Sequence, residues 1–155
     1  MIDTTQMLQI MERVWQERTT GFTGLGVVFY TPPIDLPSTP LRGDVDALGA
    51  LPVYGIDNIA RHLSAASDLR SPWHDGFHFV DVAQLSLTHL AQYLAPTLAS
   101  EVLPSGAERP SGARQMTALL TSNIPSVAAV AVISTAGDIR LYASGRLASK
   151  FTVLQ

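Results

Sequence analysis

The stretch Ser71-Pro72-Trp73-His74-Asp75-Gly76-Phe77-His78-Phe79 joins a helical pattern to an apolar strand pattern. Its proline ends the helix, because the residue before a proline is sterically disfavoured in the helical conformation. The Asp-Gly pair predicts a turn, and a turn at the edge of an α/β sheet can leave a carboxylate in the crevice where ligands bind. Asp-Gly is also an ordinary turn dipeptide, so the stretch alone leaves a purely structural role open.

The chain before this stretch predicts two helices, one strand and a long loop. Residues 4–18 carry apolar side chains at spacings of three and four, which predicts an N-terminal helix within residues 1–20, capped by Asp3 or Thr4. Residues 25–30 are short and apolar, as in a buried strand. Residues 31–54 hold half of the ten prolines. They predict a long surface loop with room for one turn of helix, either functional or a plain insertion.

Helical spacing returns over residues 55–70, and the chain after the opening stretch predicts a sheet with one more helix. The expected strands are residues 77–82, 127–134, 139–143 and, at the edge, 151–154. Residues 85–94 alternate in a way that fits either a strand or a helix. A second polar loop follows at residues 96–110. Ser111 is expected to cap the last helix, whose first N–H groups, with Arg114 beside them, would favour an anion.

Composition restricts the class of protein. The 155 residues are 46% hydrophobic and 15% charged, which predicts one folded domain over residues 1–155. The net charge is −3 and no basic run is present, which argues against binding to a nucleic-acid backbone. The absence of cysteine excludes disulfides and thiolate chemistry. Neither a signal peptide nor an apolar run of membrane-spanning length is seen, so a cytoplasmic protein without a membrane partner is expected.

In their order these elements resemble the diadenylate cyclase domain, the DisA N-terminal domain family. The family motif Ser-Pro-Leu-His-Asp-Gly-Ala matches residues 71–77, with Trp73 for leucine and Phe77 for alanine. A strand ending in a proline matches residues 87–96, and the family's Gly-Thr-Arg-His-Arg-Ala helix start falls at residues 112–118. The resemblance covers roughly residues 25–147. It implies that residues 85–94 are a strand, in an α/β fold with a single-domain mixed sheet flanked by helices.

The resemblance also implies a chemistry. Members of this family join two ATP molecules into cyclic di-AMP, with two domains face to face and a divalent metal. Asp75 would hold Mg²⁺ or Mn²⁺ or activate the ribose hydroxyl, Gly76 would allow close backbone approach, and Arg114 would contact phosphate. The other implied nucleotide-binding residues are His74, Phe77, Gly112, Gln115, Thr117 and Ser134.

The chain departs from the family pattern at three places. Met116 stands where the second arginine would serve the triphosphate, which removes a charge-assisted bond worth about 1.5–3 kcal/mol. Ser134 lacks the acidic pair that follows it in many cyclases, and only Asp138 is nearby. Phe77 replaces a small residue beside the implied catalytic acid and is expected to narrow the pocket. Each change removes something that phosphoryl transfer uses, whereas a pocket for an adenine-like base can remain.

Three functions therefore stay open. The preferred hypothesis is a nucleotide-binding sensor or degenerate cyclase, a pseudoenzyme that binds ATP or a cyclic dinucleotide without a cofactor. The second is a working divergent cyclase that uses Mg²⁺ or Mn²⁺. The third is an oligomerisation module that binds no nucleotide. A homo-oligomer is expected, because a small domain without a fused output region would act through a partner or another copy.

The histidines allow one further interpretation. His74, Asp75 and His78 lie close enough in the sequence for a zinc or manganese site, since imidazole and carboxylate suit both metals. His89 would face the same crevice if both strands point their histidines the same way. Satisfied or exposed histidines are the more common case, and His62 is expected to be solvated.

Overall fold

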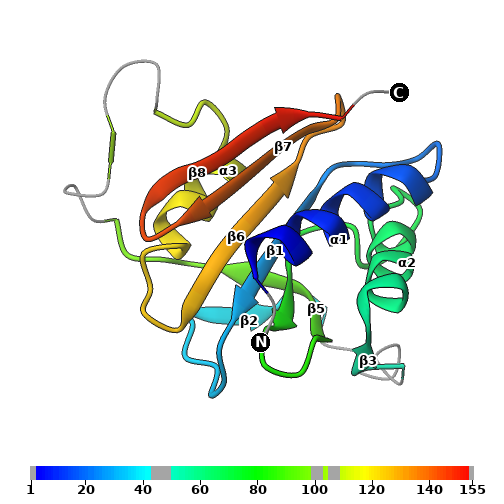
Figure 1. Cartoon of the computed structure of the whole chain (residues 1–155), viewed down its shortest axis with the longest axis horizontal. Helices are drawn as coiled ribbons and strands as arrows, with labels where there is room; N and C mark the ends of the chain where they lie inside the picture. Colours follow the sequence, from blue (N-terminus) through cyan, green and yellow to red (C-terminus); the bar gives the residue numbers. More distant parts are fainter. Residues whose placement is uncertain (1–2, 43–49, 99–102, 105–108, 154–155) are drawn as a thin grey trace.

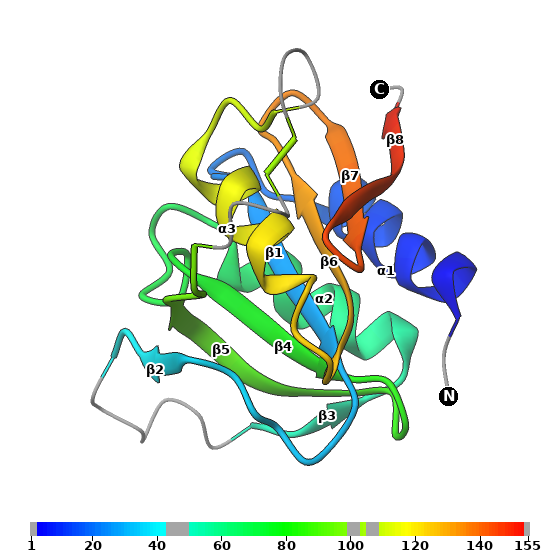
Figure 2. The same ribbon diagram turned by 90° about the vertical axis from the view of Figure 1, so that its left-hand side faces the viewer.

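The computed structural model describes residues 3–42, 50–98, 103–104 and 109–153. These residues form one eight-stranded mixed sheet with α1 and α2 on one face and α3 on the other (Figures 1 and 2). Within this described part, no helix has the length and apolar character needed to cross a membrane. The elements in chain order are α1 (Thr4–Glu17), β1 (Leu25–Tyr30), β2 (Ser38–Pro40), β3 (Val53–Tyr54), α2 (Ile56–Ala66), β4 (Phe77–Asp81), β5 (Ser86–Leu94), α3 (Ala113–Thr121), β6 (Val127–Ile133), β7 (Asp138–Ala143) and β8 (Arg146–Thr152).

The strand order is β2-β5-β4-β1-β6-β7-β8, with β3 also pairing to β5. β1 and β4 run parallel, with Val28 opposite Phe79, and the other pairs are antiparallel. β1 and β4 are buried along their whole length. Fully buried strands tend to read as continuous apolar runs, which is why the sequence pattern located β1.

Helix α1 begins at a capping box, in which the Asp3 carboxylate accepts from the Gln6 N–H and the Gln6 side chain accepts from the Asp3 N–H. Its apolar stripe and that of α2 pack on one face of the sheet, whereas Ala118 and Leu119 of α3 pack on the other face against β1 and β6. The sheet therefore lies between two apolar clusters, one under α1 and α2 and one under α3.

Residues 31–54 were predicted to be a surface loop with room for one turn of helix. In the structure this segment forms two short edge strands as well as loop. β2 and β3 both pair with β5, and the described residues 31–42 and 50–54 contain no helix. Proline is tolerated on an edge strand because the missing N–H costs no ladder bond on the solvent side. Residues 43–49 of the predicted loop lie outside the described residues.

Other boundaries also differ from the prediction. α2 ends at Ala66, before the Ser-Pro pair, and Gly112 rather than Ser111 caps α3, without a side-chain hydrogen bond. β8 begins at Arg146, although the pattern predicted a strand only from residue 151, and residue 154 lies outside the described part. Most of its side chains are exposed, so it carries little apolar alternation. β5 confirms the strand that the family resemblance implied at residues 85–94.

Candidate functional site

A pocket of about 190 Å³ lies where the Asp-Gly segment at residues 71–79, the end of β5 and the start of α3 meet. The segment at residues 71–79 and the start of α3 at residues 112–117 lie far apart in the sequence. They nevertheless come together in the fold. The lining residues are Gly76, Phe77, Gln92, Tyr93, Leu94, Ala113, Arg114 and Thr117.

Arg114 lies in the first turn of α3 and is largely withdrawn from solvent. Its Nη1 donates a hydrogen bond to the Thr23 carbonyl at 3.4 Å, across the start of β1. Burial lowers the pKa of Arg114, and the negative charge of Asp75 acts in the opposite direction. An arginine stays protonated in proteins. The pocket therefore has a fixed positive charge beside the N-terminus of a helix, an arrangement that favours an anion.

Phe77, the first residue of β4, forms an aromatic wall of the pocket. The side chain is buried, and its ring lies against Gly26 of β1: a Cβ added at position 26 would come within 2.6 Å of the ring. The missing side chain at position 26 thus provides the space for the ring. The sequence predicted a pocket narrowed by Phe77, whereas in the structure β1 makes room for the ring at Gly26.

Asp75 does not line the pocket but lies next to it in the chain. Its side chain is 74% exposed, and its Oδ1 is 3.6 Å from Nε2 of His74. His74 is held in turn by a 2.7 Å hydrogen bond between Nδ1 and the Ser71 carbonyl. The carboxylate is therefore open to solvent, while its charge is felt by Arg114.

Gly76 has a positive φ of 79°, which favours glycine. A Cβ at this position would lie 2.6 Å from the Gln92 carbonyl oxygen and 2.7 Å from the Leu41 side chain. The close approach that Gly76 permits is therefore made to β5 and to the segment after β2. This contact fixes the position of the Asp-Gly turn against the sheet.

Three other predicted residues lie outside the pocket. Gly112 is the exposed N-cap of α3. Gln115 has a buried Oε1 without a hydrogen-bond partner among the described residues. Ser134 has its hydroxyl occupied by the β6–β7 turn, where it accepts from the N–H groups of Ala136 and Asp138. Of the predicted set, the pocket unites Gly76, Phe77, Arg114 and Thr117.

The proposed metal site of His74, Asp75 and His78 is wrong for this geometry. His78 is buried in β4, and its Nδ1 accepts a 3.0 Å hydrogen bond from the Ala91 N–H. Burial, aided by the positive charge of Arg114, lowers the pKa of His78 to about 3. His89 instead packs against the Phe79 ring, and His62 is on α2. No group of three His, Cys, Asp or Glu side chains among the described residues is placed to hold a metal ion.

Strand β5 contributes to the pocket in a way that was not predicted from the sequence. Gln92, Tyr93 and Leu94 are consecutive residues, and all three line it. The register of β4 with β5 shifts just before them, and Ala91 has a positive φ of 51°. Such a bulge bends the strand and re-aims the side chains that follow it. The only signal in the sequence was that residues 87–96 match the family's second strand.

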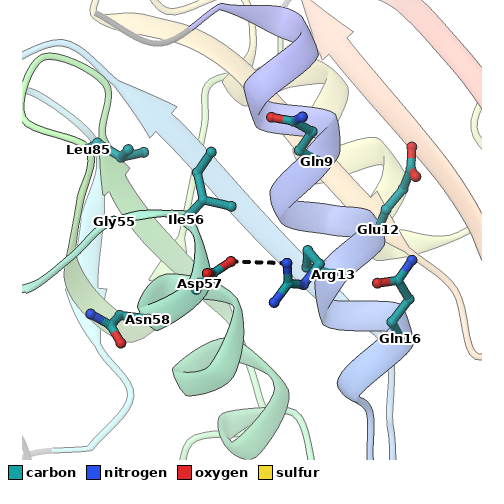
Figure 3. Close-up of a pocket in the computed structure, with 9 residues that line it drawn as sticks. All are labelled: Gln9, Glu12, Arg13, Gln16, Gly55, Ile56, Asp57, Asn58 and Leu85. Atoms are coloured by element: carbon teal, nitrogen blue, oxygen red, sulfur yellow. Dashed lines mark ion pairs between the residues drawn. The ribbon is translucent and has the colours of Figure 1, made fainter.

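A larger pocket of about 690 Å³ lies between α1 and the start of α2 (Figure 3). Arg13 and Asp57 pair across it at 3.0 Å, and both side chains are substantially exposed. Its lining contains none of the residues that the sequence singled out. Exposed ion pairs of this kind contribute little stability and are common on protein surfaces. The smaller pocket is therefore the candidate site.

Comparison with known proteins supports the fold. No protein-family model and no curated protein matches the chain. A solved structure described as a hypothetical membrane spanning protein from Bacillus cereus matches with a TM-score of 0.50 and 17% identity, over 96% of this chain and 61% of that chain. The chain thus spans less than two thirds of that protein. DacA from Staphylococcus aureus matches with a TM-score of 0.52 and 19% identity, over 92% of this chain and 84% of DacA. At these identities the likeness shows a shared fold.

Proposed function

We propose that this chain is a nucleotide-binding domain with the diadenylate cyclase fold, acting as a sensor or a degenerate cyclase. The observation that carries the proposal is the single pocket lined by Gly76 and Phe77 of the Asp-Gly motif and by Arg114 and Thr117 of α3. DacA, whose fold the chain resembles, is a diadenylate cyclase. The pocket combines an aromatic wall with a partly buried cation, which is the chemistry that a base and a phosphate require.

The size of the pocket suggests how a nucleotide would lie. Sites for whole drug-sized ligands measure about 300–1,000 Å³, whereas this pocket holds about 190 Å³. A cavity of about 150 Å³ accepts a benzene ring. The base would therefore enter the pocket, and the ribose and phosphates would remain outside, within reach of Arg114 and beside Asp75.

A divalent metal fits this arrangement if it arrives with the nucleotide. Mg²⁺ is commonly bound by one or two carboxylates together with substrate phosphates. Asp75 is the exposed carboxylate that would hold it. When bound, the metal would supply neutralisation of phosphate charge.

The loss of an arginine at Met116 favours binding over turnover. Phosphoryl transfer depends on cationic groups placed where charge develops. Arg114 is the cation that lines the pocket, and the position two residues later in α3 carries the partly buried, apolar Met116. A domain that retains one of two arginines would bind ATP or a cyclic dinucleotide more readily than it converts them.

The test combines calorimetry with product detection. Purified protein would be titrated with ATP and with cyclic di-AMP in the presence of Mg²⁺, and incubated with ATP and Mn²⁺ before mass spectrometry. Saturable binding without product is expected. Arg114→Ala should weaken binding by about ten- to one-hundred-fold, the value of a lost charge-assisted bond. Arg61→Ala is the matched control, because Arg61 is an exposed arginine on α2, across the sheet from α3.

Two outcomes would contradict the proposal. Cyclic di-AMP that forms in the wild type and disappears in Asp75→Asn would make the protein a working cyclase. The absence of both binding and product would favour the oligomerisation module. In that case size-exclusion chromatography with light scattering should show an assembly that ignores nucleotides.

A further inference from the structure

Gly26 lies in the buried interior of β1, where glycine is unfavourable for a strand. Its backbone is not in the left-handed region, so conformation does not explain the residue. The explanation is the Phe77 ring, whose Cε2 and Cδ2 atoms would lie 2.6 and 2.7 Å from a Cβ at position 26. Glycine in a strand often marks such a close approach.

The ring cannot move away from the pocket. Phe77 belongs to the same apolar cluster as Val28, Phe79 and Leu94, and the ring rests directly on the backbone of β1. Protein cores are close-packed, so a displaced ring has no free volume behind it. The face of Phe77 that lines the pocket is therefore a rigid boundary.

We infer that Phe77, seated on Gly26, is a specificity-determining residue that limits the pocket to an unsubstituted nucleobase. The inference rests on the proposed nucleotide site and adds a size limit to it. The small volume of the pocket and the fixed wall at Phe77 together exclude a base that carries a bulky substituent. Gly26 acts as a positioning residue, because it keeps the ring out of the space that the base needs.

The test uses variants that move this wall in opposite directions. Phe77→Ala removes the ring and enlarges the pocket. Gly26→Ala pushes the ring off β1 and toward the pocket. In the double variant the added methyl group no longer meets a ring. Circular dichroism and thermal unfolding would establish which variants fold, and Phe77→Leu replaces Phe77→Ala if the alanine variant does not.

The ligands are ATP and an ATP analogue with a benzyl group on the adenine amino nitrogen. We expect the wild type to bind ATP and to bind the analogue at least about ten-fold more weakly, a ratio typical of steric rejection in a tight pocket. Phe77→Ala should reverse this preference. Gly26→Ala should weaken ATP binding by about ten-fold or more, and the double variant should bind both ligands as Phe77→Ala does. A purely structural role of Phe77 would change affinity for both ligands alike and leave their ratio unchanged.

The results separate this inference from the proposed function. A wild type that binds neither ligand would overturn the nucleotide site, and the size limit with it. A wild type that binds ATP, together with a folded Phe77→Ala variant that keeps the wild-type ratio of the two affinities, would overturn the size limit alone. Strictly additive effects of the two substitutions would show that Gly26 does not act through Phe77.

Discussion

The guanidinium of Arg114 lies over Gly24, so that a Cβ at position 24 would come within 2.5 Å of Nη1. Gly24 has a positive φ of 91°, and the preceding carbonyl, that of Thr23, accepts the hydrogen bond from Arg114. The segment just before β1 therefore holds the cation of the site. Together with Gly26, which makes room for Phe77, it forms the support on which two pocket residues rest.

Gly24→Ala should weaken ATP binding as well as stability. The new methyl group would displace Arg114, and the positive φ adds backbone strain of about 1 kcal/mol or more. Gly55→Ala is a close control, because Gly55 has the same φ of 91° but no atom within 4 Å of its added Cβ. Calorimetry should show about ten-fold or greater loss of affinity in Gly24→Ala only. Equal affinities in the two variants would mean that Gly24 does not position Arg114.

Tyr93→Ala should reduce nucleotide affinity while leaving stability nearly unchanged. Tyr93 lines the pocket, yet its side chain is 55% exposed, so it offers a stacking surface without being part of the core. Stacking of a base on an aromatic side chain is worth about 1–3 kcal/mol. Tyr54→Ala removes a tyrosine that is 53% exposed, on β3 and outside the pocket lining, and should have no effect. Calorimetric titration with ATP compares the affinities of Tyr93→Ala and Tyr54→Ala. Tyr93→Phe keeps the aromatic ring and should bind ATP like the wild type.

Asp68 ties the segment before β1 to the end of α2. It bonds the Thr19 hydroxyl at 2.5 Å and forms a two-point contact with Arg70, and the side chain is only 9% exposed. These partners lower the pKa of Asp68, so its contribution to stability is present above the ordinary carboxyl pKa and is lost as the pH falls through the lower, folded value. Asp68→Asn should therefore lower the urea midpoint at neutral pH, and its stability should fall less steeply than that of the wild type in acid.

The control for this prediction is Asp57→Asn. Asp57 also pairs with an arginine, Arg13, but its side chain is 67% exposed. Exposed pairs are worth about 0–1 kcal/mol, so this variant should unfold close to the wild type. If the two variants have the same urea midpoint, Asp68 does not anchor the segment.

The central elements could be predicted from the sequence because their patterns are strong. β1 was predicted with the bounds that the structure has, and α1 ends within one residue of its prediction. β2 and β8 were not foreseen as strands of this extent, because edge strands with exposed side chains lack apolar alternation. The nature of residues 85–94 was decided only by the family resemblance.

The site was predictable in its motif residues and not in its supports. Arg114 and Phe77 were identified from the resemblance, whereas Gly26 was only a member of the strand predicted at residues 25–30 and Gly24 lay outside that strand. Their roles depend on contacts with residues distant in the sequence, which no local pattern encodes. Tyr93 was not predicted for a related reason. The shift in register at the β5 bulge decides which β5 side chains face the pocket, and the sequence does not show this shift.

His78 makes the stability of the protein depend on pH between about 3 and 6.5. It is neutral when folded, since burial, aided by the charge of Arg114, lowers its pKa to about 3. Below the ordinary histidine pKa the unfolded chain binds a proton that the folded chain does not, so stability falls as the pH falls, by at most about 1.4 kcal/mol per pH unit. His78→Asn keeps an acceptor for the Ala91 N–H and should flatten this slope. Urea unfolding between pH 6.5 and 4.5, above the range in which Asp68 titrates, measures it.

The half-buried His89, whose pKa burial also lowers, contributes a slope of the same sign in both proteins, so the comparison between wild type and His78→Asn isolates His78. His62→Asn is the control, because His62 is partly exposed on α2 and its Nδ1 bonds the Asn58 carbonyl one turn earlier. Its unfolding curve should follow the wild type at every pH. Parallel stability profiles for wild type and His78→Asn would show that His78 is protonated in the folded state, and the hydrogen bond from Ala91 to Nδ1 would then have to break.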